Sequence, residues 1–491
     1  MGSRISNAAL LPAECRALEQ RVAPHIVMVV PRGEAVRNFL YSDTLKVLSE
    51  NARVTLLSVV DDERFIGRFR PYTEAIIPLQ YVPEGRFVSY LRTIIHNAHY
   101  RWLWSGVAKN NWEWRDARAT NVPSKIRRSL WKGSIYLLAN RPTVEFLSSV
   151  ERRLGWALRQ NDDFIRLFQE IKPDLVFNCS HIHGAASDLP LTVAHHMNIP
   201  TAGFIFSWDN LTSRSRIFTP YDYYLVWNQK MRDQLLGIYP RIRRQQVFIT
   251  GTPQFDFHFK REFHLTREAL SQHIGIDSDR PFILYTTGVA HHFKEEYRTV
   301  ELVAGLLRQL EVKSRPQLVV RTYVKDTSPE MRAIEKRGLP DVVFPPVLWD
   351  PDWFTPHYED LFIYTNLLRH ASLGINAAST VSLELMMLDK PTVNLGFDPP
   401  GSNLAHHDRW IRHIEFDHYR PVAESGGTMV ARSADEIRGM LLRALTQPEA
   451  QASERKGFIK DMFGDTLDGK SGERVAECLL RLATDADRQK H

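Results

Sequence analysis

The segment from Asn376 to Glu384 combines small, hydroxylated and acidic residues at the point where an apolar run ends. We expect a strand to end at Asn376 and a helix to begin at Ser379 or Thr380. The first N–H groups of a helix have no partner within it, and the helix dipole adds about half a positive charge there. This turn is therefore predicted to bind a diphosphate, with the acidic side chain one turn further on near a ribose, although an ordinary N-cap gives the same pattern. The residues assigned to it are Asn376, Ser379, Thr380, Ser382 and Glu384.

Two other strand ends in the same half of the chain carry groups that suit a phosphate. Hydroxyl, glycine and imidazole groups follow the run Phe282–Tyr285, and basic groups end the run Gln317–Arg321. An arginine can bind phosphate oxygens with two parallel N–H groups. We expect these residues to complete the phosphate site, whereas a surface ion pair is the alternative for the arginine. They are Thr287, Gly288, His291, Arg321 and Lys325.

A second set of candidate groups follows two strands in the first half of the chain. His181 and His183 come after the expected strand Asp174–Asn178, and Asp209 follows the next expected strand, Thr201–Phe206. Open parallel sheets bind ligands at the carboxyl ends of their strands, where a carboxylate or an imidazole can act as general base. We expect Asp209 or His181 to deprotonate a hydroxyl group of a second substrate, although loop histidines are as often structural. The histidines and cysteines lack the spacing of a metal site, so no metal or other cofactor is predicted.

The stretch Arg86–Arg141 is strongly basic and rich in tryptophan. It holds eleven lysines and arginines against two acidic residues, an excess of positive charge larger than the net +6 of the whole chain, and it holds five tryptophans. This composition is typical of a surface for anionic headgroups or phosphates, but a helical insertion whose tryptophans pack inward has it too. The residues predicted to dock an acceptor or a membrane are Arg127, Arg128, Trp131 and Lys132.

Short β-branched apolar runs alternate with helical patterns along the chain, as in proteins with parallel sheets. The series runs once through the first half and restarts near Phe282, with Gly251-Thr252-Pro253 as the expected hinge. The predicted fold class is α/β, with two Rossmann-like, doubly wound parallel-sheet domains that face a cleft. The predicted division is an N-terminal domain at 1–252 with a helical insertion at about 86–141, a C-terminal domain at 253–465, and a segment at 466–491 whose helix crosses back.

The bulk composition excludes several classes of protein. With 491 residues, 43% of them apolar, the chain is long enough for two domains with their own cores. Its three cysteines lie far apart, which argues against a disulfide scaffold and a zinc site. The charged N-terminal residues do not form a secretory signal, and no apolar window reaches 18 residues. We therefore expect a cytoplasmic protein, with peripheral contact on the inner face of the plasma membrane, and no nucleic-acid partner.

Several ordered segments of the chain resemble one group of enzymes. They are Ser207–Ser213 (SWDNLTS), Val247–Asp256 (VFITGTPQFD), Asn376–Leu395, Phe416–Pro421 and Asp468–Ser471. In this order they are similar to GT-B glycosyltransferases, and most similar to the CDP-glycerol glycerophosphotransferase and capsule or surface-carbohydrate biosynthesis group. Relatives usually carry an Arg-x-His-Pro element after a strand of the C-terminal domain. Here Arg321 is kept, but Tyr323 and Val324 stand in place of the histidine and the proline.

The resemblance implies a metal-independent GT-B glycosyltransferase. Its donor would be a UDP-, GDP-, CDP- or CMP-linked sugar, and its acceptor a glycan or lipid-linked sugar in capsule or lipopolysaccharide-type polysaccharide assembly. Two related activities stay open. One is transfer of CDP-activated glycerol or ribitol phosphate, which the altered Arg-x-His-Pro element disfavours, and the other is hexosamine 2-epimerisation. A catalytically silent scaffold protein with the same fold is the alternative from another class.

Overall fold

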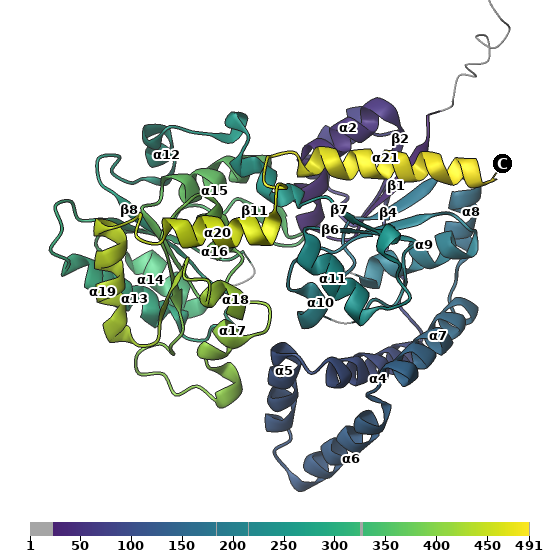
Figure 1. The fold of residues 1–491 in the computed structure, drawn as a ribbon, viewed down its shortest axis with the longest axis horizontal. Coiled ribbons are helices and arrows are strands. Elements are labelled where there is room, and N and C mark those ends of the chain that lie inside the picture. Colours follow the sequence, from purple (N-terminus) through teal and green to yellow (C-terminus); the bar gives the residue numbers. More distant parts are fainter. Residues whose placement is uncertain (1–22, 183, 215, 325–327, 491) are drawn as a thin grey trace, which may run out of the picture.

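The computed structural model describes residues 23–182, 184–214, 216–324 and 328–490, and it contains two α/β domains placed side by side (Figure 1). Two of the candidate site residues, His183 and Lys325, lie outside the described residues. Within the described part of the chain, no helix is both long and apolar enough to cross a membrane.

The N-terminal domain is built on a parallel sheet with the strand order β3-β2-β1-β4-β5-β6-β7. The order winds outward from β1 in both directions, so the topological switch point lies between β1 and β4. The central strands are nearly continuous apolar runs because helices cover both faces of the sheet. The strands are β1 (His25–Val30), β2 (Arg53–Ser58), β3 (Ala75–Pro78), β4 (Leu175–Asn178), β5 (Thr201–Phe204), β6 (Tyr223–Val226) and β7 (Val247–Ile249).

Short helical segments follow β1 directly and bring the chain against the other domain. The first, α1, contacts a small hairpin of the C-terminal domain, and the π-helix η2 continues it. Longer helices then pack on the sheet. The helical segments of this domain outside the insertion are α1 (Gly33–Ala35), η2 (Val36–Leu40), α2 (Asp43–Asn51), α3 (Glu63–Ile66), η3 (Gly67–Tyr72), α8 (Asp162–Ile171), α9 (Gly184–His196), α10 (Asn210–Ser213), α11 (Gln229–Ile238) and η4 (Arg244–Gln246).

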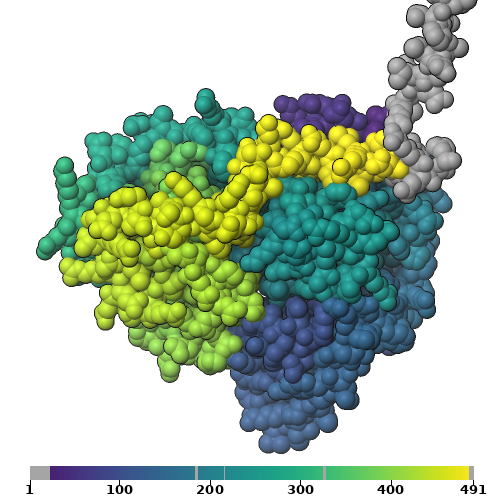
Figure 2. Space-filling view, in the orientation of Figure 1, coloured from purple at the N-terminus to yellow at the C-terminus, as the bar shows by residue number. Residues whose placement is uncertain are grey.

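The basic stretch is helical, as predicted, and it lies between β3 and α8 in the chain. Ile95, Ala98 and Val144 form a small core between the first and the last of its helices. The third of its helices, α6, lies at the far end of the molecule (Figures 1 and 2). The helices of the insertion are α4 (Arg86–Leu103), α5 (Gly106–Ala117), α6 (Val122–Leu138) and α7 (Arg141–Leu158).

The C-terminal domain repeats the architecture on a second parallel sheet, with the strand order β10-β9-β8-β13-β14-β15. A separate two-stranded antiparallel hairpin, β11 with β12, projects toward the N-terminal domain and contacts α1. The two doubly wound sheets confirm the predicted fold class. The strands are β8 (Phe282–Thr286), β9 (Gln317–Arg321), β10 (Val342–Val343), β11 (Trp349–Asp350), β12 (Thr355–Pro356), β13 (Leu373–Asn376), β14 (Thr392–Leu395) and β15 (Met429–Ala431).

Helices cover both faces of this second sheet as well (Figure 1). They are η5 (Pro253–His258), η6 (Arg261–Phe263), α12 (Arg267–Ile274), α13 (Glu296–Arg308), α14 (Pro329–Arg337), α15 (Tyr358–His370), α16 (Val381–Met387), η7 (His406–Asp408), α17 (Ile411–Glu415), α18 (Arg420–Ala423) and α19 (Ala434–Thr446).

The last two helices, α20 (Ala452–Phe463) and α21 (Ser471–Lys490), form a continuous band from the C-terminal to the N-terminal domain, where α21 lies against α2 (Figure 2). The carboxylate of Asp256 accepts hydrogen bonds from the backbone N–H groups of Ser471 (3.1 Å) and Gly472 (2.7 Å) at the start of α21. Gly251 has φ 78°, and a Cβ there would lie 2.5 Å from the Oγ of Ser471. The Thr-Gly-x-Pro-x-x-Asp motif therefore anchors the returning helix.

Candidate active site between the two domains

A cavity of about 310 Å³ lies where the two domains meet, and residues of both domains line it. The N-terminal domain contributes the helical segments after β1 and the residues after β5, and the C-terminal domain contributes the ends of β8 and β9 and the start of α16. The turn predicted to bind a diphosphate is thus part of a cavity between domains. The predicted donor residues that line it are Thr287, Arg321, Ser379, Thr380 and Glu384.

The turn before α16 forms one wall of this cavity. The helix begins at Val381 with Thr380 as its N-cap, one residue later than the predicted start. The N–H of Ser379 donates to Oδ1 of Asn376 at 3.0 Å, so one N–H of the turn is already used. The indole N–H of Trp208 donates to Oγ1 of Thr380 at 3.2 Å. This bond links the Ser-Trp-Asp-Asn element of the N-terminal domain to the turn.

Glu384 lies in the same wall and is buried. Its Oε2 is 2.7 Å from Nε2 of His258, and its Oε1 accepts the hydroxyl of Tyr364 at 2.8 Å. Burial and the neighbouring carboxylate raise the pKa of Tyr364, which keeps this phenol protonated as a donor. A carboxylate has about four acceptor positions. Since two are used, Glu384 can still accept a hydroxyl group of a ligand.

Asn376 and Ser382 do not face the cavity, so the prediction that they contact a donor is corrected. Both side chains are fully buried. The hydroxyl of Ser382 lies 3.1 Å from Oδ1 of Asn376, 2.9 Å from Oδ1 of Asn394 and 2.7 Å from the hydroxyl of Tyr419. These four side chains are linked to one another inside the domain, although the amide nitrogen of Asn394 has no hydrogen-bond partner among the described residues. Their role is to fix the shape of the turn that Ser379 and Thr380 expose.

Arg321 lines the cavity, but its charge is already balanced within the domain. Its Nη2 lies 2.7 Å and 2.8 Å from the two carboxylate oxygens of Asp360, and its Nη1 donates to the carbonyl of Pro346 at 2.6 Å. Asp360 also accepts the indole N–H of Trp349 at 2.9 Å. The arginine therefore forms a buried ion pair that holds the β11–β12 hairpin, rather than the surface pair considered from the sequence.

The three predicted residues in and after the turn that follows β8 have different surroundings. The hydroxyl of Thr287 lines the cavity and accepts the N–H of Tyr323 at 2.9 Å. The N–H of Gly288 donates to the carboxylate of Glu296 at 3.0 Å, so it is not available to a phosphate. The exposed ring of His291 lies against that of His292, with 4.0 Å between the centroids. Only Thr287 of the three predicted residues lines the cavity.

Arg37 is a cavity residue that the sequence did not reveal. It lies on η2 in the wall opposite the turn at Thr380. Its Nε donates to Oδ1 of Asn38 at 2.9 Å and its Nη2 to Oε1 of Gln254 at 3.0 Å, and both acceptors are neutral. Among the residues that the structure describes, no carboxylate lies within salt-bridge distance of this guanidinium. Arg37 is thus held in place by two amides without an ion pair of its own, although its charge also acts on the carboxylate of Glu34 in the same cavity.

Asp209 and His181 follow the strand ends next to the cavity, where Phe206 and Ser207 line it. Burial raises the pKa of Asp209, but the charge of His418 and hydrogen bonds from serines outweigh it, so the net shift is downward and the group is ionised. Burial lowers the pKa of His181 to about 4. The N–H of Phe206 donates to Nδ1 of His181 at 3.2 Å, which leaves the proton on Nε2. Of the two predicted bases, only Asp209 therefore has free lone pairs for a proton.

Arg214, at the end of α10, is an exposed arginine that the sequence reasoning also missed. Burial has the largest effect on the pKa values of His181 in the N-terminal domain and of His292 and Tyr323 in the C-terminal domain. The charge of Arg214 also affects the pKa of each of these three groups. Arg214 is therefore near titratable groups of both domains, although it lines neither of the interdomain cavities. No ion pair of its side chain occurs within the described ranges. A lone arginine in a loop has no spacing pattern by which the sequence alone could identify it.

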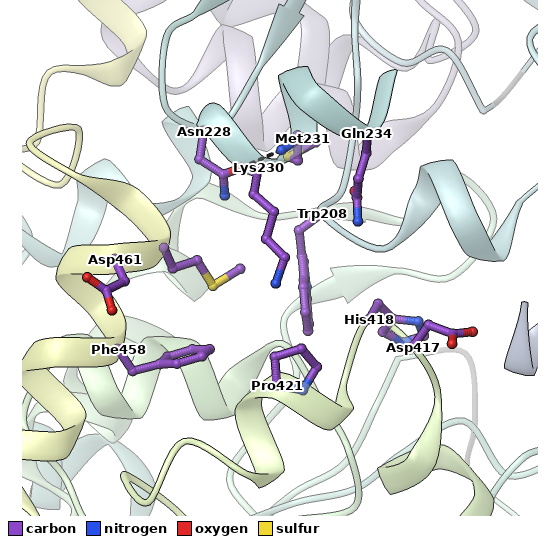
Figure 3. A pocket seen from close by; sticks show the side chains of 11 residues that line it. Trp208, Asn228, Lys230, Met231, Gln234, Asp417, His418, Pro421, Phe458 and Asp461 are labelled. Carbon is purple, nitrogen blue, oxygen red and sulfur yellow. Dashed lines mark hydrogen bonds between the residues drawn. The ribbon is translucent and has the colours of Figure 1, made fainter. Parts of the chain in front are cut away.

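A second cavity, of about 210 Å³, also has walls from both domains, and Trp208 is one of the residues that line it (Figure 3). Met231 of α11, Pro421 of α18 and Phe458 of α20 make it largely apolar. The side chain of Lys230 reaches toward the middle of these groups (Figure 3). Trp208 forms part of the wall of this smaller cavity, and its neighbour Ser207 lines the larger one.

The predicted docking residues of the insertion have different surroundings. Arg128 and Lys132 both bind the carboxylate of Asp116, at 2.7 Å and 2.8 Å. The ring of Trp131 lies 6.1 Å from that of Tyr90, between α6 and α4. Arg127 is exposed. Of the three predicted docking cations, two are thus neutralised by an acid of the insertion, and only Arg127 has no ion pair among the described residues.

Comparison with known proteins finds relatives by structure but not by sequence. No protein-family model matches the chain, and no curated protein matches it. A UDP-N-acetylglucosamine 2-epimerase structure from Listeria monocytogenes is 12% identical, covers 95% of this chain and 97% of its own, and has a TM-score of 0.54. Another UDP-N-acetylglucosamine 2-epimerase is 13% identical, with coverages of 94% and 96% and a TM-score of 0.51. UDP-GlcNAc 2-epimerase from Neisseria meningitidis, bound to UDP-GlcNAc, is 11% identical, with coverages of 93% and 100% and a TM-score of 0.50.

At these identities the likeness shows the fold alone. The match extends over nearly the full length of each chain, and it agrees with the two doubly wound sheets. A special relation to the CDP-glycerol group is not shown. The chain has the GT-B fold, which it shares with UDP-N-acetylglucosamine 2-epimerases.

Proposed function

We propose that the chain is a GT-B glycosyltransferase that transfers a sugar from a nucleotide-activated donor to a glycan or lipid-linked acceptor of the cell envelope. The observation that carries this proposal is the interdomain cavity of about 310 Å³ with Arg37 on one wall and the Ser379–Thr380 turn on the other. Hydroxyl groups and an arginine without a carboxylate partner suit a diphosphate. The Neisseria meningitidis structure of the same fold holds UDP-GlcNAc, which supports a nucleotide sugar as the ligand.

The proposed complex gives each group a role. Arg37 and Arg214 neutralise the diphosphate from the N-terminal side, and the hydroxyls of Ser379 and Thr380 contact it from the other side. Glu384 accepts a ribose hydroxyl. The acceptor oxygen bonds to the anomeric carbon while the bond from that carbon to the diphosphate breaks, and Asp209 takes the proton of the acceptor hydroxyl. No metal ion is needed to neutralise the leaving group, because the two arginines supply the charge.

A nucleotide-sugar 2-epimerase is the second candidate, because the matched structures named above are such epimerases. An epimerase needs no acceptor and would convert its nucleotide sugar alone. The basic insertion, which lies beside the cleft at η7, favours a reaction with a second, larger substrate. Polyol-phosphate transfer is the third candidate, with Tyr323 in place of the histidine as the observation against it. A silent scaffold would bind no nucleotide in this cavity.

The first test is a panel of thermal unfolding measurements with UDP, GDP, CDP and CMP. A ligand at a hundred times its dissociation constant stabilises the fold by about 2.7 kcal/mol, so the preferred base will stand out. Arg37→Gln should lower the affinity for that nucleotide by about tenfold or more, since it removes a charge-assisted contact. Arg166→Gln is the matched control, because Arg166 is exposed on α8, away from the cavity, and pairs with Asp163. A chain that no nucleotide stabilises would contradict the proposal.

A further inference from the structure

One face of α6 carries a row of apolar side chains that no other part of the described chain covers. Val122, Ile126, Leu130 and Leu137 are 69%, 57%, 71% and 81% exposed. At about 100° per residue, these positions and Gly133 fall within an arc of about 80° on the helix. We call these four side chains the α6 stripe. A helix of a water-soluble domain normally turns such an arc toward the core.

The opposite face of α6 is the one that packs on the protein. Ile135 on that face is fully buried, Arg128 lies over the ring of Trp112 of α5 at 4.6 Å, and Trp131 contacts Tyr90 of α4. Asn121 caps the helix, and its side chain accepts the N–H of Ser124 at 2.9 Å. The helix is therefore fixed in an orientation that points the α6 stripe away from both domains, at the extremity that Figure 2 shows.

The charges around the α6 stripe are all of one sign. The sequence of α6 contains no acidic residue. Lys125 and Arg127 are exposed and flank the stripe, each about 100° from its centre. The two acids between Arg86 and Arg141 are engaged elsewhere, Asp116 with Arg128 and Lys132, and Glu113 with groups of the C-terminal domain. An outward apolar stripe between cations is the arrangement of helices that lie in the plane of an anionic bilayer.

We propose that α6 rests on the surface of an anionic bilayer, with the α6 stripe inserted at the boundary between headgroups and acyl chains and with Lys125 and Arg127 at the headgroups. A second copy of the chain fits less well, because joining two stripes face to face would bring the flanking cations together. The proposal rests on the proposed function in that it names the bilayer as the surface that presents the acceptor. The membrane contact itself does not require a bound donor.

The test is flotation of the full chain with vesicles made of equal parts phosphatidylcholine and phosphatidylglycerol, without nucleotide. We expect the parent chain to float with these vesicles, less so at high salt, and not with pure phosphatidylcholine. Ile126→Gln combined with Leu130→Gln and Leu137→Gln should lower the partition coefficient by about tenfold or more. Lys125→Gln with Arg127→Gln should lower it about tenfold while abolishing most of the salt dependence.

Leu130→Gln and Leu442→Gln are a matched pair, since Leu442 is also exposed but lies on α19 of the C-terminal domain. Only the first should weaken vesicle binding, and both should keep the parent's circular dichroism and nucleotide affinity. Vesicle binding by the triple variant equal to that of the parent would overturn the proposal. The proposal would also be overturned if the parent chain did not bind vesicles but formed a dimer, and the triple variant were a monomer. Because nucleotide is absent, a failed glycosyltransferase assignment would leave the vesicle result unchanged.

Discussion

Gly33 is the position where one added methyl group should separate the two domains. It is the first residue of α1, and it lies against the β11–β12 hairpin of the C-terminal domain. A Cβ at this position would lie 2.0 Å from Oγ1 of Thr355 and 2.2 Å from the carbonyl oxygen of Trp353. Gly33→Ala therefore cannot be accommodated unless the hairpin and α1 move apart.

The size of the effect follows from these distances. An ordinary contact needs about 3.5 Å, so the hairpin must retreat by about 1.5 Å from the N-terminal domain. Overpacking of this kind costs about 1–3 kcal/mol. If the domains separate to relieve the overpacking, a ligand that bridges them must bring them together again against this energy. Nucleotide affinity should then fall by about fivefold to a hundredfold. If they do not, the same energy appears as lost stability.

The assay is a calorimetric titration with the preferred nucleotide, together with thermal unfolding, for Gly33→Ala and for Gly305→Ala. Gly305 lies in α13 with open space around its Cβ position, so its replacement should leave affinity unchanged and stabilise the helix by up to about 1 kcal/mol. If Gly33→Ala binds nucleotide like the parent and unfolds at the same temperature, the close contact between the domains does not exist in solution.

Three further predictions use other features of the molecule. Trp208→Phe removes the interdomain hydrogen bond to Thr380 and should cost about 1 kcal/mol of nucleotide affinity; an unchanged titration would show that the bond is absent from the bound state. Asp209→Asn should slow donor-dependent release of nucleotide by about 10²–10⁴-fold with donor affinity kept, and a parent-like rate would remove Asp209 as the base. Burial lowers the pKa of His99 to about 3 in the folded protein, against 6.5 in the unfolded chain. As the pH falls below 6.5, protonation of the unfolded chain therefore lowers the free energy of unfolding. His99→Gln should therefore reduce the loss of unfolding free energy between about pH 7.5 and about pH 5 by about 2 kcal/mol, as measured in urea, and an equal loss in both proteins would contradict the buried neutral imidazole.

The sheets could be predicted from the sequence because buried parallel strands are continuous apolar runs. β9 has the predicted bounds and β13 ends at Asn376 as predicted, whereas the strands predicted at β4, β5 and β8 differ by one or two residues at one end. β3, β15 and the β11–β12 hairpin were not predicted, since Ala75–Pro78 is half-exposed and the other three strands have only two or three residues each. Such short elements are set by their tertiary neighbours rather than by hydrophobic period.

The candidate site was predicted for one wall and missed for the other. The strand-to-helix turn at Thr380 has a local pattern of small and hydroxylated residues, whereas Arg37 lies in a segment without glycine-rich or basic spacing. Its place in the cavity depends on how two domains meet. Ser382 was assigned to the donor for its residue type, but its partners Asn394 and Tyr419 come from later elements that local sequence cannot place beside it.

The central claim is that a nucleotide-activated donor binds between the two domains, and hydrogen exchange tests it most directly. Amide exchange should be followed by mass spectrometry with and without the nucleotide that stabilises the chain most. The account predicts slower exchange in peptides from both walls at once, those covering residues 33–40 and those covering 376–388, with little change in α6. Protection confined to one domain, or absent from both segments, would contradict it.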